Sequence, residues 1–226
     1  MLVLALDTAT PAVTAGLLRL PALGLPELLA QRVTVDARAH GELLMPSVRD
    51  VFAAAGMRMR DLAAVVCGVG PGPFTGLRVG MVTAAALGDA LSVPVYPVCS
   101  LDAIAQAAFA GQGCGVDAGT PLLVVTDARR REVYWARYDE AGVRVRGPGV
   151  DRPADVPLGG VPRAAGAAAG AVGLPEVPPA YPDPAALVGV ALTAVRARQP
   201  PGPLTPLYLR RPDALEPGPL KPVTPV

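Results

Sequence analysis

One pattern occurs twice in the chain and limits the folds that it can adopt. In each copy an apolar run ends in an aspartate and is followed by a turn and an alternating segment. The first copy is LVLALD, ending at Asp7, with 12–18, and the second is PLLVVTD, ending at Asp127, with 132–138. Apolar runs are typical of buried strands and alternating segments of half-buried strands. The repeat suggests an internal duplication, although apolar runs that end in Asp are common.

Further predicted strands alternate along the chain with segments of helical periodicity. We expect strands over 29–36, 62–67 and 93–98, and helices over 42–55, 76–91 and 185–198. Strands mixed with helices at this spacing predict an α/β class in two related lobes. The predicted divisions are an N-terminal lobe over 1–100, a smaller C-terminal lobe over 101–216, and an extended or disordered Pro-rich tail over 217–226.

The helix over 76–91 is apolar on nearly every side. Between residues 77 and 91 only Arg78, Thr83 and Asp89 are distinctly polar. A helix on the outside of a sheet normally shows one polar face, so both faces of this one should be covered. Its own sheet covers one face, and either another part of the chain or a partner covers the other.

A stripe of small residues runs along this helix and favours a partner surface over simple burial. Gly80, Ala84 and Gly88 recur every four residues and would admit a second helix closely. The helix over 42–55 has its own apolar face. The residues predicted to bind a partner are Leu44, Val48, Val51, Phe52, Leu77, Gly80, Met81, Ala84 and Gly88.

The loop GVGPGPFTG, Gly68 to Gly76, joins a predicted strand to that helix, where backbone N–H groups can hold an anion. The specific phosphate motifs fail. Gly76 is followed by Leu77 rather than by Lys and Ser or Thr, and Pro73 takes the third glycine position of a dinucleotide fingerprint. A tight turn that lets the helix pack closely is therefore favoured over phosphate binding.

Three further segments have a chemical and a structural interpretation. His40, the only histidine, could serve a hydrolase, but no nucleophile motif accompanies it, and a residue at a helix start is favoured. The segment 7–10 could order a magnesium-bound water through Asp7, but the competing interpretation as a plain turn is favoured. The segment DARRR, 127–131, could bind RNA or an acidic partner, but the competing interpretation as a solvated hairpin tip is favoured.

Composition excludes several classes of protein. A net charge of +1, from 20 basic and 19 acidic residues, argues against a protein held to nucleic acid mainly by its own charge, although a local basic patch remains open. Cys67, Cys99 and Cys114 show no CxxC spacing, so we expect reduced thiols, no zinc site and no cofactor. No stretch is typical of a signal peptide or a membrane span, which predicts a soluble, cytoplasmic protein.

Five strings together resemble the TsaB family, whose bacterial members are also called YeaZ-type proteins. They are LALDTAT at 4–10, HGELLMPSV at 40–48, GVGPGPFTGLRVG at 68–80, DARRREVYWARY at 127–138 and LYLR at 207–210. Their order and spacing match over most of the chain, with a poor match over 144–180. The resemblance implies an actin/Hsp70-like fold (ASKHA, ribonuclease H-like) with two lobes, of which the second is smaller and degenerate.

The same resemblance implies a function. It is that of a non-catalytic subunit that binds TsaD, which transfers a threonylcarbamoyl group to the adenosine next to the anticodon of ANN-reading tRNAs. The ATPase TsaE joins that complex, tRNA is reached through the complex only, and the free chain pairs with a second copy. The predicted helices 42–55 and 76–91 match the helices that form a bundle with the partner.

Two other functions compete with this scaffold and activator. The first is a small-molecule kinase or ATPase of the same fold, which would rest on Asp7, Asp127 and the repeated lobes. The second is a glycoprotease-like peptidase built around His40.

Overall fold

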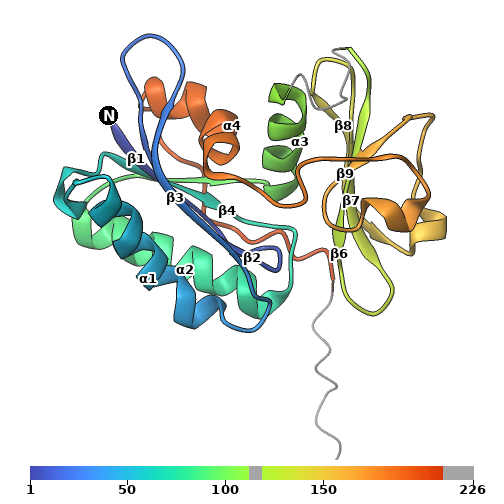
Figure 1. The fold of residues 1–226 in the computed structure, drawn as a ribbon, viewed down its shortest axis with the longest axis horizontal. Coiled ribbons are helices and arrows are strands. Elements are labelled where there is room, and N and C mark those ends of the chain that lie inside the picture. The colour runs from blue at the N-terminus through green and yellow to red at the C-terminus, as the bar shows by residue number, and fades with distance from the viewer. Residues whose placement is uncertain (112–118, 211–226) are drawn as a thin grey trace, which may run out of the picture.

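Two five-stranded sheets form the framework of the computed structural model, which describes residues 1–111 and 119–210 (Figure 1). Sheet A has the order β3-β2-β1-β4-β5 and sheet B the order β10-β9-β6-β7-β8. The strands of sheet A are β1 Leu2–Asp7, β2 Ala12–Arg19, β3 Glu27–Val35, β4 Ala64–Gly68 and β5 Val95–Val98. Those of sheet B are β6 Leu122–Asp127, β7 Val133–Tyr138, β8 Arg144–Asp151, β9 Ala164–Ala165 and β10 Glu176–Val177.

The two sheets have the same topology. In sheet A, β1 is antiparallel to β2, β2 is antiparallel to β3, and β4 runs parallel to both β1 and β5. In sheet B, β6 to β10 repeat these relations in the same chain order. The internal duplication suggested by the repeated pattern is therefore confirmed at the level of topology.

The lobes differ in the connections between equivalent strands. In the first lobe, β3 leads to β4 through α1 His40–Ala54, and β4 leads to β5 through α2 Phe74–Leu91. In the second lobe these positions hold only the short 3₁₀ helices η2 Pro153–Asp155 and η3 Ala169–Val172. The prediction of a two-lobed α/β fold with a smaller, degenerate second lobe is thus confirmed.

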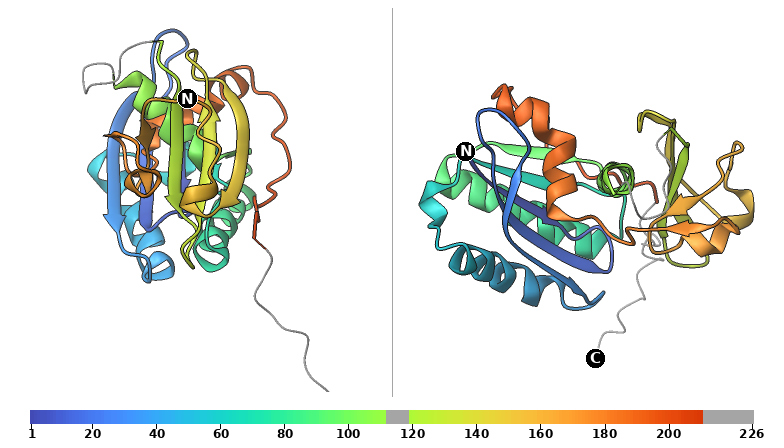
Figure 2. Two further views of the ribbon diagram at one scale, coloured as in Figure 1. Left: turned by 90° about the vertical axis from the view of Figure 1, so that its right-hand side faces the viewer. Right: turned by 45° about the horizontal axis from the view of Figure 1, so that its top comes forward.

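The inner strands β2, β1 and β4 of sheet A are buried on both faces, which explains why β1 is apolar at every position before Asp7. Leu2, Leu4 and Leu6 pack with α1 and α2, whereas Val3 and Ala5 pack with α4 Pro184–Arg196 on the opposite face. Figure 2 shows α1 and α2 below the sheet and α4 above it in its right-hand view.

Sheet B packs its two faces differently. Alternate residues of β6 and β7 contact α3 Ser100–Ala110, and the other face is covered by the short elements after β8, around the buried Trp135. The side chain of Asp102 fixes α3 to this sheet, because it accepts hydrogen bonds from the Tyr138 hydroxyl at 2.7 Å and the Arg144 guanidinium at 3.0 Å. Burial raises the pKa of Asp102.

The structure corrects the predicted organisation in three places. Residues 184–196, assigned from the sequence to the second lobe, pack as α4 on the first sheet. The helix α3 and the strand β8 were not predicted. The Gly-Pro-Gly run at 147–149 interrupts the alternation of β8, and the small residues of α3 weaken its helical pattern.

Two expectations lie outside the described residues: the Pro-rich tail over 217–226 and Cys114. Within residues 1–111 and 119–210, no helix is both long and apolar enough to cross a membrane.

The return of α4 to sheet A gives a testable expectation. Leu187 is fully buried between α4 and the sheet, so Leu187→Ala should lower the free energy of unfolding by about 2–5 kcal/mol in urea denaturation followed by circular dichroism. Thr193→Ala, at an exposed position of the same helix, is the control and should change it by less than about 0.5 kcal/mol. Equal effects of the two variants would contradict this packing.

Candidate functional site

The end of β1 carries a buried carboxylate that other parts of the chain hold in place. Asp7 is 0% exposed, and it accepts hydrogen bonds from the Ala9 backbone N–H at 2.9 Å and the Ser100 hydroxyl at 2.5 Å. Burial raises the pKa of Asp7 to about 6, and the two hydrogen bonds oppose part of that rise. Because Ser100 opens α3, this contact joins the first strand to the start of that helix.

Four glycines at the end of β4, in the loop that follows and in the first turns of α2 lie against Asp7 and the turn after it. A Cβ added at Gly68 would overlap the Asp7 carboxylate, and one at Gly72 would overlap the Ala9 carbonyl. A Cβ at Gly76 would meet the Thr8 carbonyl, and one at Gly80 would meet the Thr8 hydroxyl. The spacing of four between these glycines therefore allows the loop and the first turns of α2 to approach the end of β1 closely.

Thr8 enters the hydrogen-bond ladder of α2. Its hydroxyl donates to the Gly76 carbonyl at 2.7 Å and accepts from the Gly80 backbone N–H at 2.9 Å. These two backbone groups would otherwise bond to each other across one helical turn. Thr8 is 1% exposed, so this hydroxyl fixes the helix to β1 within the core.

The loop therefore packs as a tight turn, which the sequence favoured over phosphate binding. The Ala9 backbone occupies the space beside Gly72, and the Leu77 side chain with the Gly72 backbone occupies the space beside Gly70. Asp7 does not line the neighbouring pocket, so its carboxylate is not placed to order a magnesium-bound water there. Among the described residues, no group of three or more His, Cys, Asp or Glu could hold a metal ion.

His40 opens α1 and is 8% exposed. Its Nε2 lies 2.8 Å from the Thr10 carbonyl, which can only accept, so Nε2 carries the proton and donates it. Burial raises the pKa of the Cys99 thiol to about 11 and that of the Cys67 thiol further, which keeps both as thiols. This geometry supports the interpretation of His40 as a residue at a helix start, and neither of the two cysteines that the structure describes is activated as a nucleophile for a peptidase.

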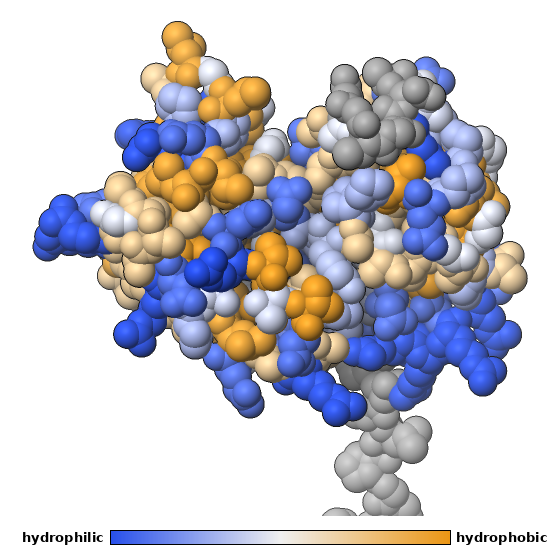
Figure 3. Space-filling view, viewed as in Figure 1, coloured by the Kyte–Doolittle hydropathy of each residue, from blue (hydrophilic) through white to orange (hydrophobic). Residues whose placement is uncertain are grey.

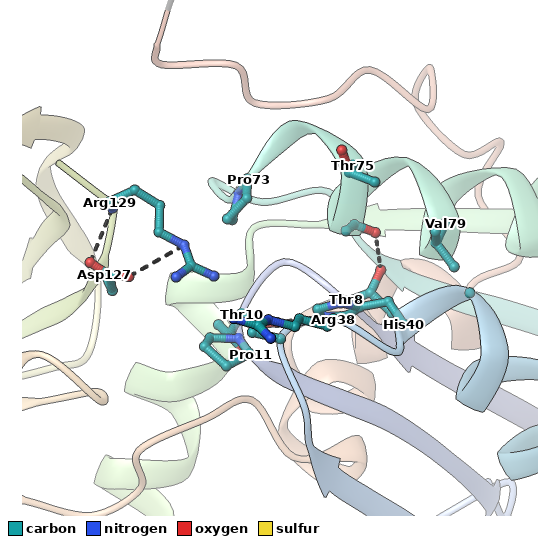
Figure 4. Close-up of a pocket in the computed structure, with 13 residues that line it drawn as sticks. Thr8, Thr10, Pro11, Arg38, His40, Pro73, Thr75, Val79, Asp127 and Arg129 are labelled. Carbon is teal, nitrogen blue, oxygen red and sulfur yellow. Dashed lines mark hydrogen bonds and ion pairs between the residues drawn. The ribbon is translucent and has the colours of Figure 1, made fainter.

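A pocket of about 130 Å³ lies between the lobes beside this histidine. Figure 4 shows Pro73, Thr75 and Val79 of the α2 end on one side, and the β1–β2 turn with Arg38 and His40 on the other. Arg129 extends into the space from the β6–β7 turn and pairs with Asp127 at 3.7 Å. The two aspartates that end the repeated runs thus differ, because Asp7 is buried in the core and Asp127 is exposed at the pocket rim.

The turn after Asp127 has an unusual backbone. Arg129, Arg130 and Arg131 have φ values of 63°, 51° and 64°, a left-handed region that residues other than Gly, Asn and Asp seldom adopt. The Asp127 carboxylate accepts from the Arg129 backbone N–H at 3.0 Å and supports the turn. The prediction of a hairpin tip with exposed arginines is confirmed.

The structure corrects which surfaces of α1 and α2 are available to a partner. All nine residues predicted to bind one are buried in the core of this chain: Leu44, Val48, Val51, Phe52, Leu77, Gly80, Met81, Ala84 and Gly88. The small-residue stripe faces inward, since Gly80 lies against Thr8 and Gly88 against Val95. The stripe therefore admits strands of the first lobe and leaves no room for a second helix.

The opposite face of α2 is the exposed one. Val82 is 66% exposed, and Ala85, Ala86 and Ala90 are exposed beside it. Arg78 and Asp89 lie on the same face at either end of this apolar stretch. These two charges were the sequence signal for the outward side, because a charged residue on an otherwise apolar helix marks the face that meets solvent.

Comparisons with known proteins agree with the geometry. The family model described as TsaD, tRNA N6-adenosine threonylcarbamoyltransferase, matches residues 27–198. The chain is 56% identical over 214 residues to an uncharacterised protein of Mycobacterium tuberculosis, covering 94% of this chain and 93% of the relative. It is 34% identical over 145 residues to the tRNA threonylcarbamoyladenosine biosynthesis protein TsaB of Escherichia coli, covering 63% of this chain and 58% of the relative. The solved structure of YeaZ from Pseudomonas aeruginosa superposes with a TM-score of 0.74 at 29% identity, covering 92% of this chain and 99% of that one.

The duplicated sheets and the packed β1 turn define a two-lobed α/β protein of actin-like architecture. The chain belongs to the tRNA N6-adenosine threonylcarbamoyltransferase family, in its TsaB or YeaZ-type branch. The resemblance found in the five strings is therefore confirmed.

The Thr8 contact predicts a specific loss of stability. Thr8→Val keeps the shape of the side chain and removes the hydroxyl that joins Gly76 and Gly80, so the free energy of unfolding should fall by about 1–3 kcal/mol. Thr8→Ser retains the hydroxyl and should recover most of this loss. Urea denaturation followed by Trp135 fluorescence and by circular dichroism measures both. A valine variant as stable as the serine variant would contradict the contact.

Asp7 predicts a pH dependence of stability. Its folded pKa of about 6 lies above the ordinary value of 3.8. Between these values the unfolded chain has released a proton that the native chain still holds, so this contribution to stability is present below pH 4 and is lost as the pH rises through 6. Relative to Asp7→Asn, which cannot titrate, the wild type should lose on the order of 3 kcal/mol across this window.

Asp127→Asn is the matched control, because it alters the equivalent strand end of the second lobe at an exposed position. Its pH profile of unfolding should follow that of the wild type. If Asp7→Asn also leaves the profile unchanged, the carboxyl of Asp7 titrates normally and its buried environment is refuted.

Proposed function

We propose that this chain is a subunit of the system that makes threonylcarbamoyladenosine in tRNA, and that it acts there as a scaffold and activator. Membership of the family and the name of the Escherichia coli relative support the pathway. The observation that carries the scaffold role is the exposed apolar face of α2.

That face is apolar at its centre and exposed in this chain. Exposed Val82, Ala85 and Ala86 occupy its centre without an intervening charge, and Met45 of the neighbouring α1 is 36% exposed. An apolar stretch of this kind between flanking charges is typical of a surface that binds another protein. The inner stripe cannot share this role, because Thr8 after β1 and Val95 of β5 already lie against it.

The proposed partner is TsaD, which carries the transferase chemistry in this family. The pair α1 and α2 would lie against two helices of TsaD, with their buried residues fixing the helices on sheet A from behind. TsaE would join this complex. In the absence of TsaD, the same apolar face would pair with a second copy of the chain. This work on tRNA would take place in the cytoplasm.

The arrangement supports a non-catalytic subunit. The one histidine donates to a backbone carbonyl, and the carboxyl of Asp7 is enclosed by hydrogen bonds to Ala9 and Ser100. His40 lines the pocket between the lobes, but its Nε2 is engaged by the Thr10 carbonyl, and Asp7 does not line the pocket. The kinase and peptidase alternatives therefore have no activated group in the described residues.

Val82→Arg tests this proposal. A charge at the centre of the apolar face should prevent a stoichiometric complex with TsaD, measured by size-exclusion chromatography with light scattering, and should reduce threonylcarbamoylation of tRNA in the reconstituted system at least tenfold. Because Val82 is exposed, the variant should retain the circular dichroism spectrum of the wild type.

Val143→Arg is the control, since Val143 is 59% exposed in the second lobe, away from α1 and α2. It should form the complex and support modification as the wild type does. If wild-type chain forms no complex with TsaD, or if Val82→Arg binds TsaD unchanged, the proposed role of this face is wrong.

A further inference from the structure

Two aromatic rings lie on the surface of a chain that has few. Phe74 is 42% exposed and Tyr208 is 39% exposed, with their ring centroids 5.1 Å apart. The guanidinium of Arg78 stacks 3.6 Å from the centre of the Phe74 ring, and its Nε–H donates to the Tyr208 hydroxyl at 3.1 Å. We call Phe74, Arg78 and Tyr208 the aromatic–arginine platform.

The fold assembles this platform from distant parts of the chain. Phe74 and Arg78 lie on the first turns of α2, whereas Tyr208 belongs to the segment that crosses from the first lobe to the second. This segment is fixed at both sides of Tyr208, because the Leu207 backbone N–H donates to the Val69 carbonyl at 2.9 Å and Arg210 donates to the Ala128 carbonyl at 3.0 Å. The planar groups are therefore held in place without a ligand.

Arginines extend from the platform onto the second lobe. Arg210 contacts the β6–β7 turn through the Ala128 carbonyl. Arg129, Arg130 and Arg131 of this turn are exposed and have left-handed backbone conformations. Two carboxylates lie among them, Asp127 and Glu132, and they pair with Arg129 and Arg210. Figure 3 shows hydrophilic side chains gathered over this end of sheet B.

The combination fits single-stranded RNA better than it fits a protein. Unstacked bases lie on aromatic rings and guanidinium planes, and arginines bind the phosphates between them. An acidic peptide would use the arginines but would have no need of two flat rings. An apolar helix would cover the rings but would also remove the neighbouring arginines from water, which is unfavourable.

We propose that the aromatic–arginine platform and the 129–131 turn bind unpaired nucleotides of RNA directly. This inference rests on the proposed function for the identity of the RNA as tRNA, and it goes beyond the expectation that tRNA is reached only through the complex. The patch is local, since the whole chain has a net charge of +1, so binding should weaken strongly as salt increases.

Fluorescence anisotropy tests the inference with a labelled, unstructured 12-nucleotide RNA and a duplex of the same composition. The full chain, alone and mixed with TsaD, should bind the single strand more tightly than the duplex. The combined variant Phe74→Ala and Tyr208→Ala should weaken single-strand binding by roughly tenfold or more. Arg129→Ala with Arg131→Ala should lower the salt dependence, by about 0.7 per lost phosphate contact in the log–log slope.

Two controls separate this surface from general effects. Arg60→Ala removes an exposed arginine of the 3₁₀ helix η1 Met59–Asp61, at the far end of the first lobe, and should leave RNA binding unchanged. Tyr208→Phe retains the ring and should change affinity less than the double alanine variant. Circular dichroism confirms that each variant is folded.

The outcomes distinguish this inference from the proposed function. Absence of RNA binding by the chain and by its mixture with TsaD, or unchanged binding by the platform variants, overturns the inference while complex formation with TsaD still stands. Loss of TsaD binding by the platform variants with RNA binding retained would show that the platform binds protein, which also overturns it.

Discussion

The close approach of the β1 end to the start of α2 determines the rest of this structure. The Thr8 hydroxyl lies between the Gly76 carbonyl and the Gly80 N–H. A side chain at any of the four glycines Gly68, Gly72, Gly76 and Gly80 would overlap residues 7–9. Asp7 extends the same contact to α3 through Ser100. The price of this packing is a carboxyl held out of water, and the hydrogen bonds from Ser100 and Ala9 offset part of it.

This packing also decides which chemistry remains open to the chain. In the first lobe, the turn and the glycine loop contact each other instead of enclosing a phosphate. In the second lobe, the equivalent aspartate stays exposed and the equivalent crossovers shrink to single turns. The surfaces that remain for binding other molecules are therefore external ones, the apolar face of α2 and the arginine-rich side where the lobes meet. The proposed role in a complex rests on these two surfaces.

Much of the fold could be predicted from the sequence, because the apolar run with Asp7 and its repeat at Asp127 mark equivalent strands in duplicated lobes. The site was harder to predict. The apolar character of α2 predicted a cover on both of its faces, of which the sheet supplies one, but the stripe of Gly80, Ala84 and Gly88 was assigned to the wrong side. Small residues mark any close approach, and only the tertiary structure shows that a strand of the same chain makes it. The role of Tyr208 could not be predicted, since it depends on a contact with Arg78 across 130 residues.

Hydrogen–deuterium exchange of the full chain with and without TsaD tests most directly the claim that α2 turns one side to its own sheet and the other to a partner. The account predicts slower exchange over 40–54 and 74–91 when TsaD is present, and unchanged exchange in β8 over 144–151. Protection confined to the second lobe, with the two helices unaffected, would contradict it.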